Sequence, residues 1–472
     1  MKRIYLLPAL LIFGVALYGK PVLPEILSDG MVLQQNSKVN IWGKAERGKT
    51  VEVKPCWSET AVRATADDKG NWLAVIETPE ASFTPRTITV SDGEEVTLKD
   101  ILIGEVWLAS GQSNMEMPLQ GFRNNPIMSA NETIAFSGQY PAIRFVTISK
   151  TQSFEPQESV EGRWQVCNPA NSPGFSATAF FFAETLHKAM NVPVGIVVSA
   201  WGGSKVEAWT DRETLKSYPD VDLSEDAVNK LSPAGRPLLM YNAMIHPIAK
   251  YVVKGFIWYQ GESNVGAHQV YPERLLNMVT LWRRQWNNPE LPFYYVEIAP
   301  YEYGNGDDDR AAYLREAQFK AQKLIPHSGM ISTNDLVEPY ELRNIHPRNK
   351  TDVGKRLAFM ALNKTYGYGR VTAHGPEYSS MEIRDGKAIV SFDHAQEGFS
   401  RTDGIEGFEI AAEDGKFLPA QAVVRDGKAE VFREGVDQPV AVRYCFRNFQ
   451  TGNLAGTREL PVVPFRTDSF EK

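Results

Sequence analysis

The segment GEVWLASGQSNMEM, residues 104–117, places a polar Gly-Gln-Ser turn directly after a short apolar run. Residues 105–109 are mostly apolar and have the length of a buried strand. Gly111 permits a tight turn, and a helix beginning near Ser113 sets the hydroxyl beside free backbone N–H groups. This pattern suits a nucleophile, although an N-cap serine has the same local signature.

Beyond this segment, apolar runs alternate with stretches of helical spacing. The sequence predicts strands at 105–109, 194–200, 253–259 and 293–298, and helices at 177–190, 271–286 and 311–324. Repeated strand, loop and helix units indicate an α/β domain with a mostly parallel sheet covered on both faces. Such sheets bind ligands at the carboxyl ends of their strands.

The flanking regions have a different pattern. Residues 22–100 consist of short alternating runs, which predict a β-sandwich, and after residue 367 short strands are punctuated by Asp-Gly pairs at 385–386, 414–415 and 426–427. We therefore predict an N-terminal β-sandwich over 20–103, a central α/β domain over 104–366 and a C-terminal β domain over 367–472.

Composition excludes several classes of protein. Of the 472 residues, 43% are hydrophobic and 23% charged, which is typical of globular chains. The net charge of −7 and the lack of basic runs argue against a nucleic-acid partner. Three scattered cysteines, Cys56, Cys167 and Cys445, allow at most one disulfide, and the seven histidines lack zinc-ligand spacing. We therefore expect no metal and no cofactor.

The first 19 residues have the pattern of a secretory signal peptide. Lys2 and Arg3 precede an apolar stretch from Ile4 to Tyr18, with a small residue at Gly19. The alternatives are a buried first strand and a short membrane anchor, and the stretch of 15 residues is shorter than the roughly 20 that an anchor needs. We expect an exported protein, periplasmic or extracellular, with no membrane segment after processing; the sequence does not indicate an oligomeric state.

Three further motifs follow the Gly-Gln-Ser-Asn-Met segment in order. They are SAWGGSKVEAW at 199–209, WYQGESN at 258–264 and NIHPRNKTDVGKRLA at 344–358. Together with LPEILSDGMVLQQ at 23–35, these segments resemble the sialate O-acetylesterase family, a carbohydrate-esterase branch of the SGNH (GDSL-like) hydrolases. The resemblance spans nearly the whole chain, and it implies a flavodoxin-like three-layer α/β/α catalytic domain flanked by the two β domains.

The resemblance also implies an ester-hydrolysis site. Ser113 is the expected nucleophile and His346 the expected general base, which then donates its proton to the departing sugar hydroxyl. The oxyanion donors that the resemblance implies are the backbone N–H groups of Ser113 and of Gly202 or Gly203, together with the side-chain amide of Gln260. Asn264 is an alternative source of that amide, and Glu262 is a candidate to hold the loop through backbone N–H groups.

The third catalytic residue is harder to assign. Hydrolases of this kind usually carry an acid two or three residues before the histidine, but Asn344 and Arg343 stand there. Asp335, at the end of the expected strand 329–334, is our candidate, with Glu338 and Glu341 also near. A neutral orienter, either Asn344 or a backbone carbonyl, would leave a Ser/His dyad instead.

The expected partner is an O-acetylated sugar, either sialic acid or another glycan. Acetylated xylan is the nearest alternative substrate, and a non-catalytic carbohydrate-binding protein is the alternative from another class. Aromatic residues in the motif loops suit a sugar pocket but equally suit a core, and basic residues nearby are candidates for pairing with a sialic acid carboxylate. The aromatic candidates are Trp201, Trp209, Tyr241, Trp258 and Tyr259, and the basic ones are Arg123, Lys205 and Arg343.

Overall fold

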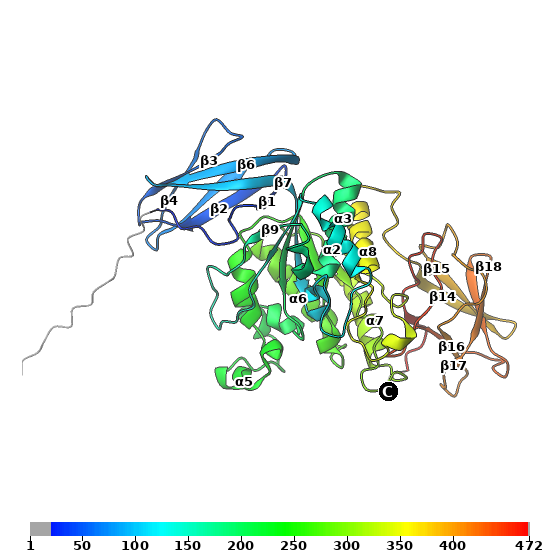
Figure 1. Cartoon of the computed structure of the whole chain (residues 1–472). Helices are drawn as coiled ribbons and strands as arrows, with labels where there is room; N and C mark the ends of the chain where they lie inside the picture. Colours follow the sequence, from blue (N-terminus) through cyan, green and yellow to red (C-terminus); the bar gives the residue numbers. More distant parts are fainter. Residues whose placement is uncertain (1–19, 471–472) are drawn as a thin grey trace, which may run out of the picture.

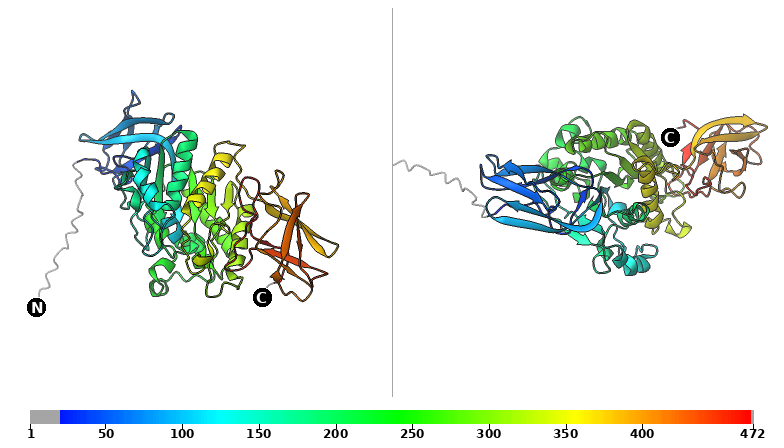
Figure 2. Two further views of the ribbon diagram at one scale, coloured as in Figure 1. Left: turned by 45° about the vertical axis from the view of Figure 1, so that its right-hand side comes forward. Right: turned by 90° about the horizontal axis from the view of Figure 1, so that it is seen from above.

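A computed structural model describes residues 20–470 of the chain. A central α/β region separates two β regions, which lie at opposite ends of the molecule (Figures 1 and 2). The predicted signal peptide, residues 1–19, lies outside the described residues. Within residues 20–470, no helix combines the length and the apolar character needed to cross a bilayer.

The N-terminal region is all-β, with a two-stranded sheet and a second sheet that continues through its last strand into the central one. Its strands are β1 (Val32–Gln34), β2 (Lys38–Lys44), β3 (Thr50–Pro55), β4 (Val62–Thr65), β5 (Asn71–Glu77), β6 (Ser82–Ser91) and β7 (Glu95–Gly111). Buried and exposed residues alternate along β5, so one face of this strand is buried. β7 pairs with β6 in its first half and enters the central sheet in its second, crossing the predicted boundary at 103/104 without interruption.

The central sheet has the order β13-β12-β11-β7-β10-β8-β9. Its further strands are β8 (Ile143–Thr147), β9 (Trp164–Val166), β10 (Val194–Ala200), β11 (Gly255–Tyr259), β12 (Phe293–Val296) and β13 (Ser328–Ile331). All neighbours are parallel except β8 and β9, so the sheet is mixed. Strands β10, β11 and β12 are entirely buried, as expected when helices cover both faces.

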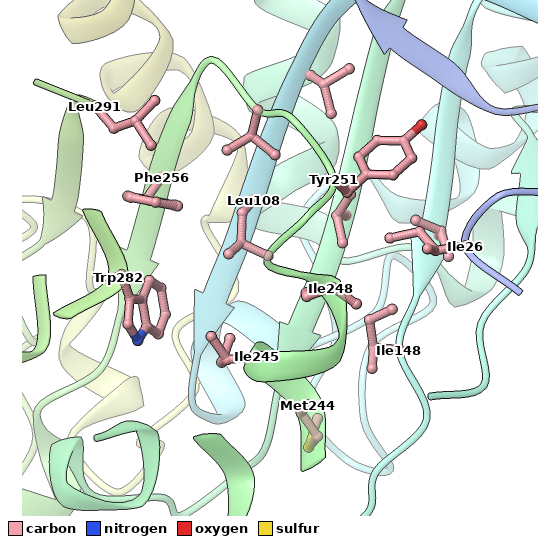
Figure 3. Packing of buried hydrophobic residues seen from close by; sticks show 14 of the residues in the cluster. Ile26, Leu108, Ile148, Met244, Ile245, Ile248, Tyr251, Phe256, Trp282 and Leu291 are labelled. Carbon is pink, nitrogen blue, oxygen red and sulfur yellow. The ribbon is translucent and has the colours of Figure 1, made fainter. Parts of the chain in front are cut away.

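Helices cover both faces of the sheet. They are α1 (Ser113–Glu116), α2 (Ala130–Phe136), α3 (Ala177–Met190), α4 (Arg212–Leu215), α5 (Glu225–Lys230), α6 (Tyr271–Gln285), α7 (Arg310–Leu324) and α8 (Lys350–Lys364). Trp107 and Ala109 of β7 pack with α3 and α8. Val106 and Leu108 face the other way, toward α6 and α7, in the cluster drawn in Figure 3. This alternation produces two hydrophobic layers, one on each side of the sheet.

The C-terminal region is a second β module. It contains β14 (Glu377–Arg384), β15 (Lys387–Asp393), β16 (Phe408–Ala411), β17 (Leu418–Pro419), β18 (Gln421–Arg425), β19 (Lys428–Phe432), β20 (Ala441–Tyr444) and β21 (Phe465–Arg466). Two of the three Asp-Gly pairs, at 385–386 and 426–427, form two-residue hairpin turns with positive φ at both positions, as predicted. The third, Asp414-Gly415, lies in the longer β16–β17 connection.

Candidate active site

Three neighbouring parallel strands bring the first three motifs to one edge of the sheet. Gly111 at the end of β7 is in register with Ala200 of β10 and with Tyr259 of β11. The residues that follow, including Ser113 and Gly202, therefore emerge side by side at the carboxyl ends of the strands. This is the edge where the sequence predicts the chemistry.

The turn after β7 requires glycine. Gly111 has φ +136°, and a Cβ there would lie 2.2 Å from the carbonyl oxygen of Tyr259. The backbone is fixed on both sides, because Trp201 N–H donates to Gly111 O (3.0 Å) and Gln112 N–H donates to Tyr259 O (2.9 Å). Ser113 follows as the first residue of α1 and stays partly exposed.

Gly202 lies against Ser113, as the predicted oxyanion site requires. A Cβ built on Gly202 would be 3.3 Å from the Cβ of Ser113. The Gly202 N–H donates to Glu116 Oε2 at 2.6 Å. Within residues 20–470, no acceptor is recorded for the backbone N–H of Ser113 or for that of Gly203, which is exposed.

Gln260 does not offer its amide to the serine. Its Nε2 donates to Ser204 O (3.0 Å) and to Asn264 Oδ1 (2.7 Å), and its Oε1 accepts from the hydroxyl of Tyr271 (3.0 Å). Both N–H groups of this fully buried amide are therefore occupied. The alternative donor, Asn264, is buried too, and its Nδ2 donates to the carboxylate of Glu207. The predicted amide donor thus has a structural hydrogen-bond network in place of an oxyanion contact.

The residue after the serine ties the His346 loop to the sheet edge. Asn114 Nδ2 donates to Ile345 O at 3.0 Å and to Glu262 Oε1 at 2.5 Å. Asn114 Oδ1 accepts from Lys350 Nζ (2.8 Å), and the same ammonium donates to Pro347 O (2.6 Å). The carbonyls on either side of His346 are therefore both held by this network.

The predicted acid does not contact the histidine. Both carboxylate oxygens of Asp335 pair with Arg356 of α8, at 2.7 and 2.5 Å, and no hydrogen bond joins Asp335 to His346 within the described chain. The assignment of Asp335 as the ring partner therefore has no support in the geometry. Asn344 Oδ1 accepts from the backbone N–H of His346 (3.0 Å), so Asn344 holds the loop backbone and does not orient the imidazole ring. The ring contacts Phe122 edge-on.

The other two acidic candidates are held near the start of the same loop. Glu341 accepts the backbone N–H groups of Glu338 (3.0 Å) and Arg348 (3.0 Å). Glu338 and Glu341 also form a reciprocal capping box around the short helix at 339–341. Their carboxylates therefore shape the loop. Within residues 20–470, no hydrogen bond is recorded between Ser113 and His346, or between the His346 ring and any of the three acidic candidates.

Burial and charge set the protonation of this site. Burial, reinforced by the Lys350 charge and opposed by that of Glu116, lowers the pKa of His346 from 6.5 to about 4. The ring is therefore neutral and able to accept a proton over the physiological range. Burial lowers the pKa of Lys350 to about 7 and raises the pKa of Glu262, and the attraction between the two groups opposes both shifts.

Most of the aromatic candidates are core residues. Trp209, Tyr241, Trp258 and Tyr259 are at most 3% exposed, and only Trp201 among the five is partly accessible. The basic candidates are all exposed: Arg343 pairs with Glu302, whereas Arg123 and Lys205 have no recorded ion pair within the described residues.

Sequence reasoning missed three residues of this site: Asn114, Glu116 and Lys350. Lys350 carried a detectable signal, because it shares helical spacing with the buried Val353 and Leu357 and a lysine on a buried face needs a partner. Glu262 was singled out as a loop holder. Its carboxylate accepts the Asn114 side-chain amide and its own backbone N–H, and both hydrogen bonds oppose the rise of its pKa. Its second oxygen, Oε2, is buried without a recorded partner.

Comparisons with known proteins identify the family of the chain. The model of a family described as carbohydrate esterase, sialic acid-specific acetylesterase, matches residues 103–363. Sialate O-acetylesterase from Rattus norvegicus is 27% identical over 83% of this chain and 82% of its own, and the one from Homo sapiens is 26% identical over 84% and 81%. The crystal structure of a carbohydrate acetylesterase from Xanthomonas citri is 34% identical, covers 95% of this chain and 100% of its own, and has a TM-score of 0.85. The chain is therefore a carbohydrate esterase of the sialic acid-specific acetylesterase family.

Proposed function

We propose that this esterase removes acetyl groups from the hydroxyls of sialic acid, with Ser113 as nucleophile and His346 as general base. The observation that carries the proposal is the joining of the two motifs by Asn114, which follows Ser113 in the chain and binds the carbonyl of the residue before His346. A neutral imidazole and a serine at a strand end are the groups that acyl transfer to a hydroxyl requires.

In the proposed reaction, His346 takes the proton of Ser113 while the serine oxygen attacks the acetyl carbonyl. The N–H groups of Ser113 and of Gly202 or Gly203 stabilise the oxyanion. The tetrahedral intermediate collapses, the sugar oxygen leaves with the proton from His346, and the acetyl group stays on Ser113. Water, activated by the same imidazole, then releases acetate.

The finer points of fold and location belong to the same proposal. The order β10-β7-β11-β12-β13 corresponds to the flavodoxin-like winding 2-1-3-4-5, which supports an SGNH-type catalytic domain. The curated relatives named above are sialate O-acetylesterases, which favours sialic acid over acetylated xylan. The pattern of residues 1–19 supports export to the periplasm or the exterior.

The test is acetate release by the purified protein from O-acetylated sialic acid, acetylated xylan and 4-nitrophenyl acetate. Ser113→Ala should lower turnover by at least about 10³-fold on every substrate that the wild type cleaves, because removing a nucleophile disables the catalytic unit. Ser217→Ala, on an exposed serine that donates only to Thr214 O, is the matched control and should leave the rate unchanged.

The outcomes separate the proposals. Preference for acetylated sialic acid supports the assignment, and preference for xylan moves it to the alternative glycan. A folded wild-type protein that releases no acetate from any of the three substrates contradicts the reaction itself and favours a binding protein. Equal activity of Ser113→Ala and wild type removes Ser113 from the mechanism.

A further inference from the structure

The Gly202 N–H already has an acceptor in the free protein. Glu116 Oε2 accepts it at 2.6 Å, and the Cβ position of Gly202 lies 3.3 Å from that oxygen and 3.3 Å from the Cβ of Ser113. The oxyanion of the proposed reaction needs the same N–H. A carboxylate left beside a developing negative charge also opposes that charge by repulsion. Gly202 therefore serves as an oxyanion donor only after Glu116 has moved.

Glu116 is placed so that it can exchange partners. It is the last residue of α1, three positions after Ser113, and its other oxygen, Oε1, accepts from Lys150 Nζ at 2.7 Å. The side chains of Glu116 and Lys150 are 24% and 44% exposed, so a ligand in front of Ser113 can reach both. The Lys150 ammonium also lies 5.7 Å from the centre of the Trp201 ring, the one accessible aromatic candidate.

Resting on the function proposed above, we propose that Glu116 is a specificity-determining residue. In the free enzyme its carboxylate occupies the Gly202 N–H. When an acetylated sugar binds, the carboxylate leaves this N–H and accepts a hydrogen bond from a free hydroxyl of the sugar. A sugar hydroxyl is a hydrogen-bond donor and competes directly with the Gly202 N–H for the carboxylate. Lys150 keeps the other carboxylate oxygen during the exchange. A substrate with no hydroxyl must break the hydrogen bond between Glu116 and the Gly202 N–H without forming a new hydrogen bond to the carboxylate.

The two classes of ester therefore respond to loss of Glu116 in opposite directions. In Glu116→Ala the Gly202 N–H is open at all times, so kcat/KM for 4-nitrophenyl acetate, which has no hydroxyl, should rise by up to about tenfold. For mono-O-acetylated sialic acid, which has free hydroxyls, kcat/KM should fall by roughly 10- to 100-fold, the value of a hydrogen bond to a charged group.

The experiment measures kcat/KM for both esters with wild type, Glu116→Ala and Glu116→Gln. Gln keeps the shape and one acceptor oxygen without the charge, so its changes should have the same signs and be smaller. Because the Glu116 charge raises the pKa of His346, rates are compared on the pH plateau of each variant. Glu184→Gln, which breaks a similar ion pair with Lys188 on α3, is the control and should change neither rate.

A rise for the aryl ester together with a fall for the sugar ester supports the proposal. Parallel losses on both esters at unchanged thermal stability overturn it and place Glu116 in the chemistry common to both. Unchanged rates overturn it as well. A wild type that cleaves the aryl ester but no sugar ester contradicts the proposed function instead, so the two failures are distinguishable.

Discussion

Replacing Lys350 with methionine should lower the stability of the protein and move the acid limb of its pH–activity profile to higher pH. The ammonium is fully buried at the first residue of α8, and it reaches Glu262, which is 7% exposed, through the amide of Asn114. Methionine has a similar length but neither the charge nor the donors. The variant therefore leaves a buried carboxylate without its cation and frees the carbonyl of Pro347.

The size of the effect follows from that burial. Lys350 and Glu262 are bridged by Asn114, and no direct ion pair between them is present among the described residues. Removing the ammonium leaves two buried acceptors, Asn114 Oδ1 and Pro347 O, without their donor, at a cost of about 1–3 kcal/mol each. At roughly 2–4 °C per kcal/mol for a domain of this size, the melting temperature should fall by about 10 °C. Adding Glu262→Gln removes the stranded charge, so the double variant should recover part of the loss.

The assay measures the thermal unfolding of four proteins: wild type, Lys350→Met, Glu262→Gln and the double variant. It also measures the pH profile of kcat/KM. The Lys350 charge lowers the pKa of His346, so the acid limb should move from near pH 4 toward higher pH in Lys350→Met. The reasoning is refuted if Lys350→Met melts within about 2 °C of wild type, if the two substitutions are strictly additive, or if the acid limb does not move.

Two further predictions follow from the same contacts. Asp335→Asn weakens the pair with Arg356 and should lower stability by about 1–3 kcal/mol, yet it should leave the pH profile of kcat/KM in place; a shifted profile would restore Asp335 as the partner of His346. The pKa of His346 is about 4 in the folded protein and 6.5 ordinarily, so between these values the unfolded chain binds more protons. Wild-type melting temperature should therefore fall as the pH drops from about 6.5 to 4, more steeply than that of His346→Gln; parallel curves would contradict this.

The sequence alone determined the elements and the edge of the sheet where the site lies. The strand at 194–200 and the helix at 177–190 form at the predicted residues, because the hydrophobic period that specifies them is local. The two Asp-Gly hairpins follow from the φ preferences of adjacent residues. Gly111 was recognisable for the same reason, because a tight turn directly after a strand needs a backbone conformation that glycine adopts most easily.

The motif order located the site but did not orient its side chains. Gln260 lies at the end of the predicted strand, yet its amide turns to Ser204 and Tyr271 because these groups enclose it. Asp335 lies near the His346 loop in sequence, but a bidentate partner on α8 binds it more favourably than an imidazole edge can. Both assignments needed the positions of residues that the motifs do not contain.

The tertiary structure decided how the histidine is held and how the glycine donor is guarded. Asn114 meets Glu262 across 148 positions and Lys350 across 236, and Glu116 reaches Gly202 across 86. Local sequence fixes which atoms a residue can offer, through its side-chain chemistry and backbone preferences. Which distant partner receives them depends on the register of β7, β10 and β11 and on the burial that follows, and these are set only when the whole sheet has assembled.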